Sequence, residues 1–495
     1  MTLRRHLLAA TAPYIGFVAL MFLLIWVPNT FEPVIRNDPA RNIDIPKDLL
    51  HEMRVKVAYN DEEVFFRFEL PTEEPAWYHD YWIYEGEGKW RRQGRSPVGR
   101  EPELMYEDRI SFFLDDGHVP EFGKWGGFVT VSGREMRFFS EEASQREVRE
   151  HPHLGPRGVS DVRKWLPETR EDPHDWRTIK SEQELAELRR DGYFLDLWHW
   201  RAHRSNPIGW SDDQYIQDYR WSDEGRGPYT TNWDEEEQRP TYMFDQEKTG
   251  QHAMRLEKVR EQAYGQQDYM RYALILGNEE IEGNAAIFDP NHDWQVGDVI
   301  PRRLLRVPAG SRGAIRANGI FRDGAWLVDL WRALDTGSPL DDKAVHHRGT
   351  YQIAFAAHIL ATGSRWHYVS FPMTLGLERD ADIRAVRFDE AAPPWHRMEW
   401  TDIKLFYPGQ IDWSHLISEA HAGAPYIAKG IPLRDGHDEW TLAQYAVQSQ
   451  FRKEIRRQWA QTLFALVGAV FLFGVAVRIA EPRHAYPASD EEESQ

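Results

Sequence analysis

The stretch Val55–Leu70, VKVAYNDEEVFFRFEL, contains two short runs rich in Val, Tyr and Phe on either side of an Asn60-Asp61 pair. β-Branched and aromatic residues favour strands, and an Asn-Asp pair between two such runs is a turn signal. The stretch therefore predicts an antiparallel hairpin.

Similar runs, punctuated by Gly, Asp and Pro, follow along the chain. They are DRISFFLDD (108–116), GFVTVSG (127–133), EMRFFS (135–140), GAWLVDLWRAL (324–334), TYQIAFAAHIL (350–360) and WHYVSFPMTLGL (366–377). Short strands between turn residues predict a mainly β fold, an antiparallel β-sandwich. A clear helix signal is Ser181–Gly192, SEQELAELRRDG, with an N-cap Ser, a Glu three residues on and a closing Gly.

Long loop insertions are expected near residues 141–177 and 211–260. The first is rich in His, Pro and charge, and Ser211–Arg239 is acidic and aromatic. Such segments are usually solvated loops, although long loops in compact domains also carry binding surfaces.

Two apolar segments predict membrane anchors, Leu7–Val27 and Gln458–Val477. Each has about the 20 apolar residues that a bilayer span requires. The alternatives are a cleaved signal peptide for the first and a buried helix for the second. The expected order is an anchor at 1–30, a domain at 31–400, a closing segment and linker at 401–457, a second transmembrane helix at 458–479 and an acidic tail at 480–495.

The charges beside these segments predict the orientation. Arg4 and Arg5 precede the first segment, which places the N-terminus in the cytoplasm and the large domain on the extracytoplasmic, periplasmic side. The basic run from Arg452 to Arg457 favours the opposite orientation, but the first helix usually decides.

The composition excludes several kinds of chemistry. The 495 residues include no Cys, which rules out thiolate metal sites and covalent attachment of haem. A formal charge of −19 argues against a nucleic-acid partner.

Familiar catalytic motifs are absent, so the chain is better suited to an electron-transfer subunit than to a catalytic one. Isolated His and Asp pairs could bind a metal or Ca²⁺ but are more often exposed loop residues: His151/His153, His346/His347, Asp212/Asp213 and Asp341/Asp342.

The run FLDLWHWRA (194–202) carries a more specific pattern. Strand alternation places Leu195, Leu197, His199 and Arg201 on one face and Trp198 and Trp200 on the other. The later run RWHYVSF likewise places His367 with apolar residues. Each histidine could simply be a core residue. Two such histidines beside Trp and Arg also suit haem, which needs imidazole ligands and arginines for its propionates.

Five segments in order resemble the haem-binding domain of ethylbenzene dehydrogenase-related proteins, over roughly Arg54–Val386. They are YEDRISFFL (106–114), DVRKWLP (161–167), DLWHWRAHRSNPIGWSDDQY (196–215), WLVDLWRALDTGSPLDD (326–342) and AFAAHILATGSRWHYVSFPMTLGL (354–377). The resemblance implies a β-sandwich that binds haem b non-covalently and exchanges electrons with a molybdopterin oxidoreductase.

The resemblance also bears on the iron ligands. The γ-subunit of this family holds haem with a Met before the WxW strand and a Lys in the strand matching RWHYVSF. Here RRDGYFLDLWHW (189–200) has no Met, and the Lys position falls on or beside His367. We therefore expect His199 and His367 as iron ligands. The tryptophans Trp198 and Trp200 would wall the haem, Arg201 and Arg365 would pair with propionates, and the reserve ligands are Met105, His203, His358 and Met373.

The sequence thus favours a membrane-anchored haem b electron-transfer protein. Its redox partner would be a molybdopterin oxidoreductase or a membrane cytochrome. Two alternatives stay open: a ligand- or carbohydrate-binding β-sandwich, and a structural subunit that has lost haem.

Overall fold

A computed structural model describes residues 50–94, 106–131, 144–359, 367–406 and 459–471, with internal gaps at 161, 163, 173–174, 262–271 and 469. Asn37–Gln450 forms one compact unit, and all strands below belong to it. The fold is mainly β with mostly antiparallel pairing, as the sequence predicts.

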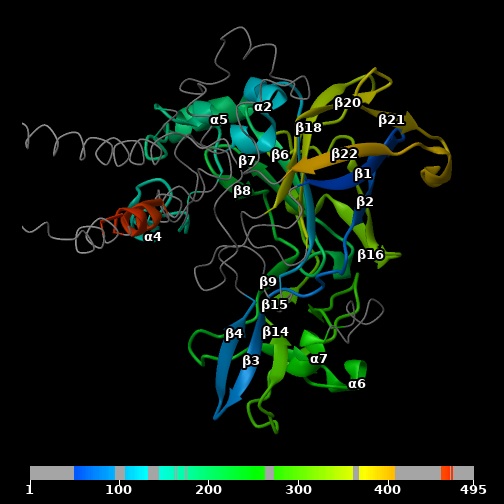
Figure 1. The fold of residues 1–495 in the computed structure, drawn as a ribbon. Coiled ribbons are helices and arrows are strands. Elements are labelled where there is room, and N and C mark those ends of the chain that lie inside the picture. The colour runs from blue at the N-terminus through cyan, green and yellow to red at the C-terminus, as the bar shows by residue number, and fades with distance from the viewer. Residues whose placement is uncertain are drawn as a thin grey trace, which may run out of the picture. The chain divides into compact units, whose positions relative to one another are not determined.

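Thirteen strands of the described residues join in one large sheet (Figure 1). Eleven follow one another in the order β16 (Arg316–Arg322), β17 (Ala325–Ala333), β2 (Glu63–Pro71), β1 (Leu50–Tyr59), β21 (Ile383–Arg387), β20 (Met373–Leu377), β18 (Thr350–His358), β5 (Arg109–Asp115), β6 (Leu195–Arg201), β7 (Asp212–Ile216) and β8 (Arg220–Ser222). The remaining two, β19 (Tyr368–Ser370) and β22 (Thr401–Phe406), link β18 to β1 by a second path.

The two halves of this sheet pack face to face. Phe66 of β2 contacts Phe112 of β5 and Trp198 of β6, with ring centroids 4.8 Å and 5.3 Å apart. Phe68 likewise meets Phe355 of β18. These aromatic rings are buried, and burial of such large apolar surfaces is the main force that holds the two layers together.

The predicted hairpin is confirmed. β1 and β2 pair antiparallel from Arg54↔Glu69 to Tyr59↔Val64, and the Asn60 side chain accepts hydrogen bonds from the backbone of Glu62 and Glu63. β22, at the start of the expected closing segment, pairs along β1. The sheet is not wholly antiparallel, since β21 runs parallel to both β1 and β20.

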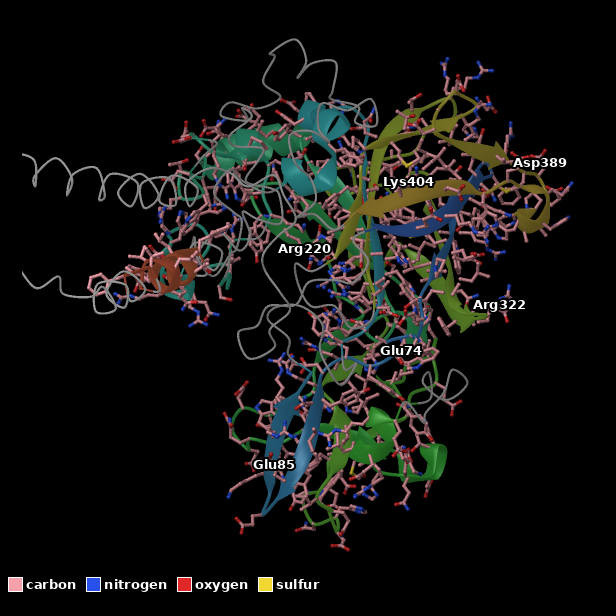
Figure 2. The ribbon with its side chains drawn as sticks, viewed as in Figure 1. Glu74, Glu85, Arg220, Arg322, Asp389 and Lys404 are labelled. Carbon is pink, nitrogen blue, oxygen red and sulfur yellow. The ribbon has the colours of Figure 1, made fainter. Side chains whose placement is uncertain are left out.

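Smaller sheets are built from the remaining strands. β3 (Tyr81–Gly86) pairs with β4 (Lys89–Gln93) and β14 (Asp298–Pro301), and β14 pairs with β11 (Met254–Arg255). A three-stranded sheet contains β12 (Leu274–Ile275), β15 (Arg303–Leu305) and β9 (Tyr229–Thr231), and β10 (Tyr242–Phe244) pairs with β13 (Ala285–Ile287). Charged side chains such as Glu85 and Arg322 are exposed at strand ends (Figure 2).

The helices both confirm and correct the sequence analysis. α5 (Glu182–Arg190) has the predicted start, a capping box in which Ser181 and Glu184 each bind the other's backbone N–H. The strand expected at 127–133 is wrong, because 127–130 belong to α2 (Pro120–Thr130). Short helices α4 (Gln145–Glu150), α6 (Gln246–Thr249) and α7 (Leu256–Arg260) lie within the expected insertions.

The segment Ser211–Arg239 is not the solvated loop that its charge suggested. Its first part continues the large sheet as β7 and β8, and every residue of β7 is buried. Asp212 and Asp213 are buried there because arginines from other strands neutralise them. The prediction of a solvated loop, made from composition alone, is therefore wrong for the first part of this segment.

Among the residues that the structure describes, no helix is both long and apolar enough to cross a bilayer. The expected anchor at 1–30 lies outside the described residues. Of the expected second transmembrane helix, residues 459–471 (apart from 469) are described and helical, and Phe464 and Phe471 there are 72% and 69% exposed.

Candidate functional site

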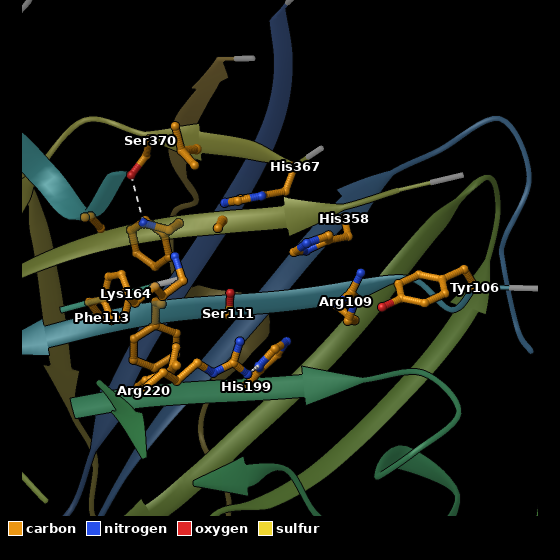
Figure 3. A pocket seen from close by; sticks show the side chains of 17 residues that line it. Tyr106, Arg109, Ser111, Phe113, Lys164, His199, Arg220, His358, His367 and Ser370 are labelled. Atoms are coloured by element: carbon orange, nitrogen blue, oxygen red, sulfur yellow. Dashed lines mark hydrogen bonds between the residues drawn. The ribbon is translucent and has the colours of Figure 1, made fainter. Parts of the chain in front are cut away.

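A cavity lies on the face of β18, β5 and β6 that points away from the packed aromatic core. Strand register brings its residues side by side, because Val369 of β19 pairs with Ala356, Ala356 with Ser111, and Ser111 with His199. A second row on the same face, two residues along, joins His358, Arg109 and Arg201. Figure 3 shows Arg109, Ser111, His199 and His358 on these neighbouring strands.

The lining combines imidazoles, cations and apolar groups. It consists of Tyr106, Arg109, Ser111, Phe112, Phe113, Gly127, Lys164, Leu197, His199, Arg220, Ala354, Phe355, Ala356, His358, His367, Val369 and Ser370. None of these described residues is a carboxylate, so the pocket favours an anionic ligand. Gly127 of α2 lies so close to Phe113 that a Cβ there would be 2.5 Å from the ring.

His199 is held by two arginines. Nη2 of Arg220 lies 2.7 Å and Nη2 of Arg201 lies 3.0 Å from its Nδ1. A guanidinium has no acceptor, so Nδ1 must accept both hydrogen bonds. A neutral imidazole then carries its proton on Nε2, which is buried without a hydrogen-bond partner in the described structure. In this tautomer Nε2 is a hydrogen-bond donor and not an iron ligand.

The charges around His199 keep it neutral. Burial lowers its pKa well below the ordinary value, and the nearby guanidinium groups of Arg201 and Arg220 lower it further. Burial also lowers the pKa of Arg109 to about 10, which leaves that guanidinium charged at neutral pH. The Lys164 ammonium lies over the Phe113 ring, 5.7 Å from its centroid. The positive charge of the pocket is therefore carried by Arg109, Arg220 and Lys164.

The other two histidines form a pair. The rings of His358, at the end of β18, and His367, just before β19, are stacked with centroids 4.7 Å apart (Figure 3). His199 lies two strands away from β18 on the same sheet face, and neighbouring strands are spaced about 5 Å apart. His199 and His367, the two expected iron ligands, thus line one cavity on the same face of one sheet.

The other expected site residues are placed differently. Trp198 and Trp200 lie on the opposite face of β6, in the core, where Trp198 contacts Phe112 at 5.1 Å and Trp200 contacts Trp326 at 5.1 Å. Arg201 is on the pocket side of β6, but it is bound by Asp212 through a 2.6 Å ion pair. The tryptophans therefore do not line the cavity.

Of the reserve ligands, one lines the cavity, two lie elsewhere in the described structure and one is not described. His358 lines the cavity. His203 is fully buried beside Glu107, and Met373 begins β20; neither lines the cavity. Arg365 and Met105 lie outside the described residues.

Sequence reasoning missed Arg109, Lys164 and Arg220. Alternation along YEDRISFFL could have placed Arg109 on the same face as Ser111 and Phe113. Nothing in the sequence indicated Arg220, which lies in the segment expected to be a loop. Lys164 lies outside any strand, and its only signal was its place in DVRKWLP, one of the five segments of the family resemblance.

A comparison with protein-family models found one described as ethylbenzene dehydrogenase, which matches residues 33–370. That match covers more than half of the chain. The chain belongs to the ethylbenzene dehydrogenase family. All described residues that line the cavity fall within the matched range. A search of curated proteins found no match.

The donors in the cavity suit the cofactor that the sequence analysis expected for this family. Haem b has two propionates, a flat apolar ring and an iron that accepts imidazole nitrogen. The cavity offers cations for the propionates and the apolar side chains of Phe113, Leu197 and Val369 for the ring. His358 or His367 could supply the imidazole nitrogen for the iron.

Proposed function

We propose that this member of the ethylbenzene dehydrogenase family is a haem b electron-transfer protein. The observation that carries the proposal is one cavity containing three histidines and three non-histidine cations but no carboxylate among its described lining residues. A group with anionic substituents and an imidazole-binding metal matches this set better than a neutral sugar does.

Within the proposal the pocket residues have separate roles. His367, with His358 beside it, would hold the iron, and bound haem b would supply one-electron chemistry. Arg109, Arg220 and Lys164 would neutralise the propionates. His199 would donate from Nε2 to an anionic oxygen, because its Nδ1 is occupied by two arginines. Apolar neighbours would exclude water and so help set the reduction potential.

The redox partner would be a molybdopterin oxidoreductase or a membrane cytochrome. Family membership supports the first, since the family is named for ethylbenzene dehydrogenase. An electron-transfer subunit needs no general acid or base, which agrees with the absence of catalytic motifs from the sequence.

The absorption spectrum of the purified full-length chain tests the cofactor. We expect a Soret band whose height scales with protein, and extraction with acidic organic solvent should remove it because no cysteine can bind haem covalently. A chain that purifies folded, and that gains no Soret band when titrated with haemin, would contradict the proposal. That result would favour a structural or other ligand-binding subunit.

We also propose that the chain is membrane-anchored with its large domain outside the cytoplasm. The apolar segments Leu7–Val27 and Gln458–Val477 support this, as do the exposed Phe464 and Phe471 on the described helix. The chain should remain in membranes washed with alkaline carbonate. A reporter fused near Gly250 should be active only if it functions after export; activity of a cytoplasmic reporter there would reverse the orientation.

A further inference from the structure

A second group of charged residues lies on the core side of β6, on the opposite strand face from His199. Asp196 of β6, Asp213 of β7 and Asp342 each offer a carboxylate oxygen, and these oxygens lie within 4.8 Å of one another. All three residues are buried. Carboxylates are rarely buried unless they are paired or bind a metal, so this group needs compensating positive charge.

Arg332 of β17 supplies part of that charge. Its Nη2 donates to Asp196 Oδ2 at 2.7 Å, and its Nη1 donates to Asp342 Oδ1 at 2.7 Å and to Asp213 Oδ2 at 3.1 Å. The guanidinium therefore binds one oxygen of each carboxylate. Asp342 Oδ2 accepts from Thr336, whereas Asp196 Oδ1 and Asp213 Oδ1 have no hydrogen-bond partner in the described structure.

A fourth buried carboxylate, outside the triad, lies next to this group and is an independent observation. Asp223, which follows β8, is 3% exposed, and neither of its oxygens has a hydrogen-bond partner among the described residues. The backbone nitrogen of Asp223 donates a hydrogen bond to the carbonyl oxygen of Asp213, 3.4 Å away, so Asp223 lies next to the group.

The neighbouring cations are engaged elsewhere. Lys343 binds Asp115 and Asp116, Arg189 binds Asp341, and Arg312 binds Asp212. Among the described residues, three of the four buried carboxylates thus bind one guanidinium, and the fourth, Asp223, binds none. A divalent cation would leave a net charge of only −1 from the same residues.

We propose that Asp196, Asp213, Asp223 and Asp342 bind one Ca²⁺ ion, with Arg332 as the fixed counter-charge. The donors are all carboxylate oxygens, which hard cations prefer, and Ca²⁺ takes oxygens at about 2.3–2.6 Å, so ligands on opposite sides of it are about 5 Å apart. That separation agrees with the 4.8 Å limit on the oxygens of the triad. One member of the group, Asp342, also lines a cavity together with Thr336 and Lys343.

The site would be structural. It ties β6, β7 and the segments after β8 and β17, and it lies across β6 from the imidazole pocket. The proposal does not depend on haem binding, because the two groups of residues share no member.

The test measures calcium in the purified full-length chain by mass spectrometry after dialysis, then thermal unfolding with and without a chelator. We expect one Ca²⁺ per chain, removed by EDTA, with a lower unfolding midpoint that added Ca²⁺ restores. Asp223→Asn should weaken Ca²⁺ binding at least roughly tenfold, while the exposed-residue variant Asp389→Asn should match the wild type.

Three results would overturn the assignment: no bound metal together with no response to millimolar Ca²⁺, restoration by Mg²⁺ but not by Ca²⁺, or wild-type Ca²⁺ affinity in Asp223→Asn. If that variant does not fold, metal content and chelator response of the wild-type chain decide alone. Haem absorbance, measured on the same samples, should stay unchanged, so failure of the calcium proposal is distinguishable from failure of the haem proposal.

Discussion

Arg220 and His199 meet inside the cavity, where the guanidinium Nη2 donates to the imidazole Nδ1 at 2.7 Å (Figure 3). The contact joins β8 to β6 across β7. It fixes the tautomer of His199, and it distinguishes this histidine chemically from the stacked pair His358 and His367.

The first prediction concerns two of the cavity histidines, His367 and His199. His367→Ala should abolish haem binding or convert a low-spin spectrum to high-spin, because it removes the proposed iron ligand. His199→Gln should keep the spin state and weaken haem retention only, since Gln can still donate a hydrogen bond. The exposed His396→Gln serves as control. Loss of the low-spin spectrum in His199→Gln alone would return the ligand role to His199.

The second prediction concerns Trp198, whose ring is fully buried between Phe66 and Phe112. Trp198→Ala should lower the free energy of unfolding by about 3–5 kcal/mol through the cavity it leaves. Denaturant titration measures this, with Ile320→Ala on the exposed face of β16 as control. Haem bound per folded chain should not change. A loss of haem at unchanged stability would place the indole in the cofactor site instead.

The third prediction concerns Arg332, which is 1% exposed and bound to three carboxylates. Arg332→Met should lower the free energy of unfolding by about 3–5 kcal/mol in chelator, because it leaves buried charges unpaired. Arg322→Met, at the exposed end of β16, should change it little (Figure 2). Equal stability of the two variants would show that the carboxylates are neutral without the guanidinium.

The fourth prediction concerns pH. Burial lowers the pKa of His203 to about 4, whereas the unfolded chain binds the same proton at its ordinary value near 6.5. The unfolded state therefore binds more protons between these two pH values. Stability from this group is complete above pH 6.5 and is lost as pH falls toward 4, by at most about 1.4 kcal/mol per pH unit.

Comparison of thermal unfolding between pH 7 and pH 4 tests this contribution. His203→Gln should show a shallower loss of stability than the wild type, and His396→Gln should show the same loss as the wild type. Identical slopes for all three proteins would mean that the buried imidazole is not responsible.

Features that depend on near neighbours in the chain could be predicted from the residues alone. The hairpin of β1 and β2 follows from two apolar runs and a turn. The start of α5 follows from the capping box that Ser181 forms with Glu184, three residues later. Alternation along β6 likewise placed His199 and Trp198 on opposite faces, because a strand fixes side-chain direction locally.

The buried charges and the histidines that meet in the cavity depend instead on the packing of distant strands. Asp213 looked like a residue of a solvated loop, yet Arg332 of β17, more than a hundred residues later, neutralises it in the core. His358 and Arg109 join the cavity through the pairing of β18 with β5. Burial of a charge depends on a partner that sequence spacing does not reveal, and register between distant strands is set by how whole faces pack.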